Sequence, residues 1–67
     1  MANKTQNEKW LTQYNIGQNI QIDHPEGSGE EPATITAFTA DMQGRLDGVM
    51  VKFEDGVWIE IEASSLP

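Results

Sequence analysis

Residues 48–62 read Gly-Val-Met-Val-Lys-Phe-Glu-Asp-Gly-Val-Trp-Ile-Glu-Ile-Glu, and their pattern is the strongest indication of the fold. Apolar residues occupy every second position on both sides of Asp55-Gly56, a dipeptide that favours tight hairpin turns. Such alternation predicts two half-buried strands, over 48–53 and 57–62, joined as an antiparallel hairpin. Odd-numbered residues would then face the interior of the protein, and even-numbered residues would face outward.

Similar patterns elsewhere in the chain predict two more strands and their connections. Alternation over 19–23 predicts a first strand, and the β-branched run over 33–38 predicts a second. Residues 24–32 contain two prolines and two glycines and are expected to form the loop between these strands. Residues 41–44 predict a turn, and residues 64–66 predict a final 3₁₀ turn that places a leucine against the core.

The N-terminal residues predict a short helix. Thr5 and Glu8 have the spacing of a capping box, and Trp10, Leu11 and Tyr14 follow at helical spacing. A helix of two or three turns is unstable on its own, so it is expected to dock on the strands. The expected organisation is therefore a helical segment over 1–14, packed on a single β-domain over 15–67.

Four short strands without room for crossover helices predict an antiparallel meander. Because a meander has two exposed edges, we expect it to curl into a small barrel. The residues expected to fill the core are Ile20, Ile22, Ile35, Val49, Val51, Phe53, Val57, Ile59, Ile61 and Leu66.

The stretch 32–35, the hairpin 48–62 and the closing Ser65-Leu66 resemble a Tudor domain or a related SH3-like barrel. The resemblance covers about the last half of the chain, and it implies a mostly β, single small antiparallel SH3-like barrel that binds peptides or nucleic acid at its strand loops. Tudor domains that read methylated side chains surround the cation with an aromatic cage. At the matched positions Glu31, Phe53 and Gly56, only Phe53 is aromatic, so the resemblance implies no methyl-reading.

The charge balance restricts the partners. The 67 residues include eleven acids and four bases, which gives a formal net charge of −7. Such a chain repels phosphate backbones and anionic membranes, so we expect a protein partner with a basic surface. Cysteine is absent, which excludes disulfides and thiolate metal sites. The first ten residues lack the apolar run of a signal peptide, and we expect a cytoplasmic protein.

Catalytic and metal-binding patterns are weak. His24 is the only histidine; we expect it to be an exposed loop residue, because no activated nucleophile accompanies it. Residues 41–47 contain oxygen ligands, but the spacing departs from that of a calcium-binding loop. We therefore expect no enzymatic activity and no cofactor or metal.

Trp58 is the first candidate for partner binding. Alternation places it on the outer face with Glu60 and Glu62, while Met50 and Lys52 share that face on the neighbouring strand. An exposed tryptophan flanked by methionine and acids would suit a basic or amphipathic partner. In the alternative interpretation, the N-terminal helix covers this tryptophan, and the lysine forms a cross-strand ion pair with one of the two glutamates.

Acidic residues form the second candidate surface. We expect one cluster around the last hairpin and another around the 24–32 loop. The first comprises Asp47, Glu54, Asp55, Glu60 and Glu62, and the second Asp23, Glu26, Glu30 and Glu31. The two could imitate the charge spacing of a nucleic-acid strand and block a basic cleft, as small acidic phage inhibitors do, or they could only solvate the surface. A third hypothesis is oligomerisation through an open barrel edge.

Overall fold

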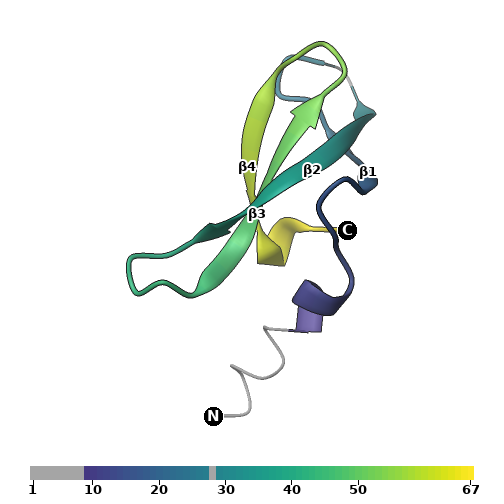
Figure 1. Cartoon of the computed structure of the whole chain (residues 1–67). Coiled ribbons are helices and arrows are strands. Elements are labelled where there is room, and N and C mark those ends of the chain that lie inside the picture. The colour runs from purple at the N-terminus through teal and green to yellow at the C-terminus, as the bar shows by residue number, and fades with distance from the viewer. Residues whose placement is uncertain (1–8, 28) are drawn as a thin grey trace.

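The structure, a computed structural model, describes residues 9–27 and 29–67 (Figure 1). The strands form one antiparallel sheet in chain order, which confirms the expected meander. The elements are η1 (Lys9–Thr12), β1 (Asn19–Asp23), β2 (Glu30–Ala40), β3 (Leu46–Phe53), β4 (Trp58–Glu62) and η2 (Ala63–Ser65), where η marks a 3₁₀ helix.

The sheet does not close into a barrel. Within the described residues β1 pairs only with β2, and β4 pairs only with β3, so β1 and β4 are both edges. The prediction of a mostly β, antiparallel fold is confirmed, whereas the closed barrel is not formed. The final 3₁₀ turn is confirmed as η2, and Leu66, immediately after it, packs against the core.

The second strand is longer than the sequence indicates. β2 begins at Glu30, so the prediction of a loop through 32 is wrong for its last three residues. These residues pair with β1, where Glu30 lies opposite Asp23 and Pro32 opposite Gln21. Proline is tolerated here because β2 begins to pair with β3 only at Ala33, so the missing N–H costs no ladder hydrogen bond.

The described part of the N-terminal segment, residues 9–14, packs on the sheet and forms a 3₁₀ turn instead of an α-helix. This turn is η1, and the expected capping residues 5 and 8 lie outside the described residues. The ring of Trp10 packs against Phe38 with centroids 5.9 Å apart, and the Tyr14 hydroxyl donates to the Pro67 carbonyl. In the described part of the chain, no helix is long and apolar enough to cross a membrane.

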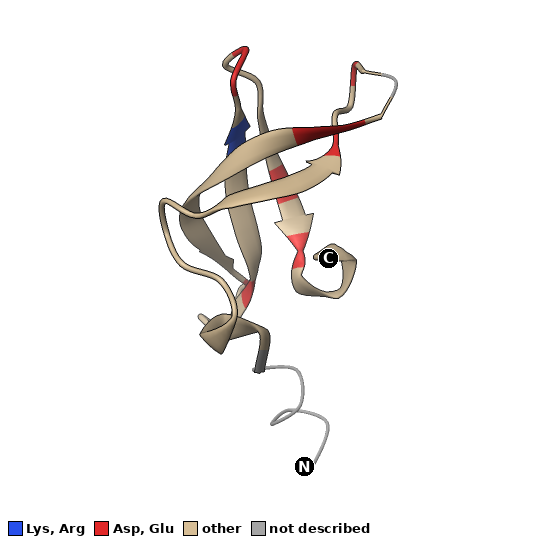
Figure 2. Cartoon of the chain, turned by 90° about the vertical axis from the view of Figure 1, so that its right-hand side faces the viewer, with Lys and Arg blue, Asp and Glu red and all other residues tan. Residues whose placement is uncertain are grey.

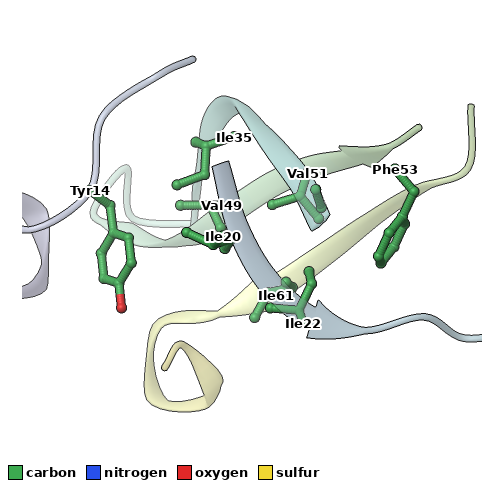
Figure 3. Packing of buried hydrophobic residues seen from close by; sticks show 9 residues of the cluster. Tyr14, Ile20, Ile22, Ile35, Val49, Val51, Phe53 and Ile61 are labelled. Atoms are coloured by element: carbon green, nitrogen blue, oxygen red, sulfur yellow. The ribbon is translucent and has the colours of Figure 1, made fainter. Parts of the chain in front are cut away.

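The core lies on the concave side of the twisted sheet (Figure 3). All ten residues predicted to fill it are buried or packed against it, which confirms the alternation in β1, β3 and β4. The most completely buried side chains are Ile35, Val49, Val51 and Phe53. Tyr14 and Ala33 join them, so the N-terminal segment contributes directly to the core.

The two hairpins that flank β3 share one turn geometry. The Gly44 N–H donates to the Asp41 carbonyl at 2.9 Å, and the Gly56 N–H donates to the Phe53 carbonyl at 3.0 Å. Both glycines have positive φ, +84° and +94°, which residues with a Cβ adopt only with strain. A type I turn followed by a left-handed residue is the usual form of three-residue hairpins.

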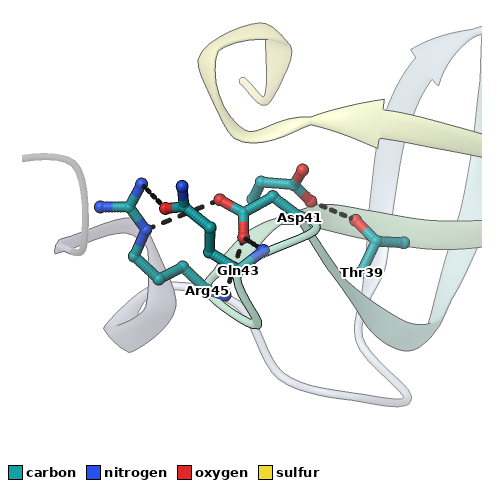
Figure 4. A network of polar contacts seen from close by, with 5 residues as sticks. Thr39, Asp41, Gln43 and Arg45 are labelled. Atoms are coloured by element: carbon teal, nitrogen blue, oxygen red, sulfur yellow. Dashed lines mark hydrogen bonds and ion pairs between the residues drawn. The ribbon is translucent and has the colours of Figure 1, made fainter.

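An aspartate reinforces each turn. Asp41 Oδ1 accepts the backbone N–H groups of Gln43 and Arg45, and the Arg45 side chain returns to the same carboxylate and to the Gln43 side chain (Figure 4). These backbone hydrogen bonds, with that from Arg45 first, hold the pKa of Asp41 below its usual value. The turn is therefore held by its own side chains.

Candidate functional site

Trp58 lies at the start of β4 on the outer face of the sheet, where the sequence placed it. It is 53% exposed, although its neighbour in sequence, Val57, packs on the core. The described part of the N-terminal segment, residues 9–14, does not cover this indole, because Trp10 lies against Phe38 and Tyr14 is buried near Pro67. The outer face therefore presents an uncovered tryptophan.

Lys52 is the cross-strand partner of Trp58. The register of β3 and β4 places them opposite each other, and the Lys52 Nζ lies 5.5 Å from the ring centroid. This is within the range of a cation–π contact. The alternative in which Lys52 lies opposite Glu60 or Glu62 is wrong. The turn places Phe53 opposite Val57, so the residue opposite Lys52 is Trp58, two residues before Glu60.

Beyond this pair the outer face turns acidic. Glu60 lies opposite Met50, which is half-buried, and Glu62 lies opposite Gly48. Gly48 contributes no side chain, and an added Cβ would lie 2.2 Å from the Ile61 carbonyl oxygen. Because its partner on β3 is a glycine, Glu62 has no cross-strand side chain opposite it. Trp58, Met50, Glu60 and Glu62 thus form one continuous surface, which we call the outer β4 face.

The acidic residues expected around the last hairpin do not form one cluster. Asp47 lies near the start of β3 and Glu54 directly follows its end, about 23 Å apart along the strand at about 3.3 Å per residue. Asp47 instead accepts a hydrogen bond of 3.0 Å from the Thr39 hydroxyl in β2. The prediction of a single cluster is therefore wrong for Asp47, while Glu54 is exposed in the turn as expected.

Asp55 has a structural role in the same turn. Its Oδ1 accepts the Val57 N–H at 3.0 Å, and its Oδ2 lies 2.9 Å from the Nε2 atom of His24. The Val57 hydrogen bond is the main cause that lowers the pKa of Asp55, and the hydrogen bond from His24 acts in the same direction. A carboxylate with both oxygens occupied in this way offers less to a partner than its exposure indicates.

The prediction that His24 is an exposed loop residue is wrong. Its side chain is only 3% exposed and its ring lies on Phe53, with centroids 4.3 Å apart. The Glu26 N–H donates to Nδ1, so Nε2 carries the proton that is donated to Asp55. The signal was present in the sequence: Ile20 and Ile22 point inward, and His24 continues the same alternation.

The stacking of His24 also affects Phe53, the one aromatic residue at the positions matched to a Tudor cage. Phe53 is 1% exposed, because His24 and the core cover it, so its ring is not available to a ligand. In residues 9–27 and 29–67, no three His, Cys, Asp or Glu side chains are grouped so that they could hold a metal ion. Comparison of the chain with family models, curated proteins and solved structures found no match.

Proposed function

We propose that this protein is a non-catalytic interaction module that binds a partner protein through the outer β4 face. The observation that carries the proposal is the exposure of Trp58. The chain has five aromatic residues, and the other four are buried or half-buried. So small a domain needs most of its apolar side chains for its own core, so an exposed tryptophan is best explained by the binding of a partner.

The chemistry of the partner follows from the surroundings of Trp58. Glu60 and Glu62 lie along β4, and Lys52 is the only cation on β3 or β4. A basic rim around an apolar or aromatic anchor would complement this arrangement. The antiparallel meander and the final 3₁₀ turn support an SH3-like origin for the module, in keeping with the Tudor resemblance.

The test is a pull-down with the immobilised full chain, washed at low and then at high salt. A partner held by Trp58 survives the high-salt wash and is lost with Trp58→Ala. The matched control is Met42→Ala, because Met42 is fully exposed in the β2–β3 turn, outside the outer β4 face. Retention of the same partner by Trp58→Ala would refute the proposal.

A second function, imitation of a nucleic-acid strand, is favoured by one observation. The His24–Asp55 contact ties the β1–β2 loop to the β3–β4 turn, so acids of the two predicted clusters lie at one end of the sheet. Figure 2 shows acidic segments on both loops at that end and along β4. Such a surface could occupy a basic nucleic-acid-binding cleft.

The two functions give opposite results in the same assay. Binding by the acidic surface is released by salt, survives Trp58→Ala and fails when Glu60 and Glu62 are both changed to Lys. Binding by the outer β4 face fails with Trp58→Ala and tolerates salt, because apolar burial is little screened. A basic nucleic-acid-binding protein released at high salt would place the imitation function first.

A further inference from the structure

The two edge strands leave a groove between them. A pocket of about 280 Å³ lies between β1 and β4. Ile22, Ile59 and Ile61 supply its apolar side chains, and Gln21, Asp23 and Glu30 supply polar groups. Residues from one edge and from the other thus line a single cavity, which we call the seam groove.

The backbone along β4 is available at this groove. The Phe53 N–H donates to the Val57 carbonyl, so odd-numbered residues of the β4 segment direct their N–H and C=O groups toward β3. The alternating pattern then turns the backbone groups of Trp58, Glu60 and Glu62 away from β3, along the open edge. An edge of this kind is a template for another strand.

The chemistry of the occupant is fixed by the two sides of β4. A strand added antiparallel to β4 would place alternate side chains on the outer face beside Glu60 and Glu62, and the others inward toward Ile59 and Ile61. β1 and β4 carry Asp23, Glu60 and Glu62, and neither strand contains a lysine or an arginine. The outward positions of the incoming strand therefore suit lysine or arginine, and the inward positions suit apolar residues.

A second copy of this chain does not meet that requirement. Its own edges carry the same acids, and each copy has a net charge of −7. Pairing two such edges would oppose like charges, which is destabilising both at short range and through the overall field. The acids on the edges thus disfavour self-association and leave the seam groove to a basic partner.

We propose that the partner binds as an extended segment of alternating basic and apolar residues that pairs with the open edge of β4 and fills the seam groove. The inference rests on the proposed interaction function and specifies its mode. Main-chain hydrogen bonds would give affinity, and the alternation of side chains would give specificity. Trp58 begins β4, so in this antiparallel pair it would lie beside the last basic residue of the segment.

The test is an NMR titration of the full chain with two synthetic peptides. The first alternates lysine and valine over seven residues. The second has the same sequence with N-methyl groups on the lysine backbone amides, which are those that would face β4 in an antiparallel pair. We expect the first peptide to slow hydrogen exchange at the Trp58, Glu60 and Glu62 amides, and the second to bind about tenfold more weakly.

Two variants separate the contribution of the edge backbone of β4 from that of its negative charge. Glu60→Pro removes an edge N–H without removing a hydrogen bond to β3, since proline is compatible with an outward-facing edge position. Glu60→Gln keeps the N–H and removes the charge. We expect Glu60→Pro to weaken peptide binding more than Glu60→Gln does. Amide spectra of the free variants are the control that tests whether both retain the fold.

The results distinguish this inference from the function on which it rests. Equal affinity for the two peptides, or equal loss in the two Glu60 variants, would overturn strand pairing. If either result were found while Trp58→Ala still abolished partner binding in the pull-down, the interaction function would stand and only strand pairing would be rejected. Protection confined to β1 amides, or a dimer in sedimentation of the free chain, would also overturn the inference.

Discussion

The Nε2 atom of His24 lies 2.9 Å from Oδ2 of Asp55, and this contact joins two segments that are 31 residues apart. His24 follows β1 directly and its ring covers Phe53, while Asp55 lies in the turn between β3 and β4. The sheet has no hydrogen bonds between its edge strands β1 and β4, so this contact connects the β1–β2 hairpin to the β3–β4 hairpin where strand pairing does not. It therefore holds one end of the open sheet together.

His24→Ala is expected to lower the free energy of unfolding by roughly 2 to 3 kcal/mol. The change removes a ring packed on Phe53 and leaves the Glu26 N–H without its acceptor. Urea denaturation at neutral pH measures the effect, and Met42→Ala, at a fully exposed position, serves as the control with a change of about 0.5 kcal/mol or less. Equal stability of the two variants would show that the contact has no structural weight.

The contribution of Asp55 is expected to depend on pH. Its pKa is lowered in the folded protein, so its stabilising effect is fully present above the unfolded value of roughly 4. The effect is lost as the pH falls through the lower, folded value. Asp55→Asn should therefore be less stable than the wild type at pH 6, and the difference should shrink at pH 2.5. Denaturation at both pH values tests this, and a constant difference would contradict it.

The strands could be predicted from the sequence because each buries one face. In β1, β3 and β4 the apolar residues alternate, and this period identified the core correctly. β2 departs from the pattern, since a register shift between Ile35 and Ala37 interrupts its alternation and Pro32 lies inside it. Closure of the barrel could not be predicted, because it depends on the distance between β1 and β4 and not on the pattern within either strand.

The candidate site was predicted in part. The exposure of Trp58 followed from alternation, but its partner Lys52 depends on register, which the three-residue turn fixes. The alternation restricts that register, because Phe53 and Val57 both face inward and can lie opposite each other only across a turn with an odd number of residues, of which the three-residue turn is the common form. Asp47 and Glu54 are close in sequence, but the extended strand between them keeps their side chains far apart.

Gly48→Ala is expected to destabilise the protein by about 3 kcal/mol. The added Cβ would lie 2.2 Å from the Ile61 carbonyl oxygen and 3.0 Å from the Thr39 Oγ1, so β3 and β4 would have to separate. Gly29→Ala is the matched control, because its Cβ would meet nothing within 4 Å. That variant should be unchanged or slightly stabilised through its unfolded state. Chemical denaturation measures both, and comparable stability of the two would contradict the close approach.

The contact between Lys52 and Trp58 is expected to contribute about 0.5 to 1 kcal/mol, because both side chains are exposed. A double-mutant cycle with Lys52→Met and Trp58→Leu isolates this coupling from the loss of apolar area. Met is chosen because it keeps the length of the lysine side chain without its charge. The free energy of unfolding of the four proteins gives the coupling, and the same cycle with Thr34→Val in place of Trp58→Leu is the control, since Thr34 lies opposite Lys52 on its other side. A coupling at Trp58 no larger than that at Thr34 would contradict the prediction. It would mean that the lysine lies over the indole ring without adding to the free energy of unfolding.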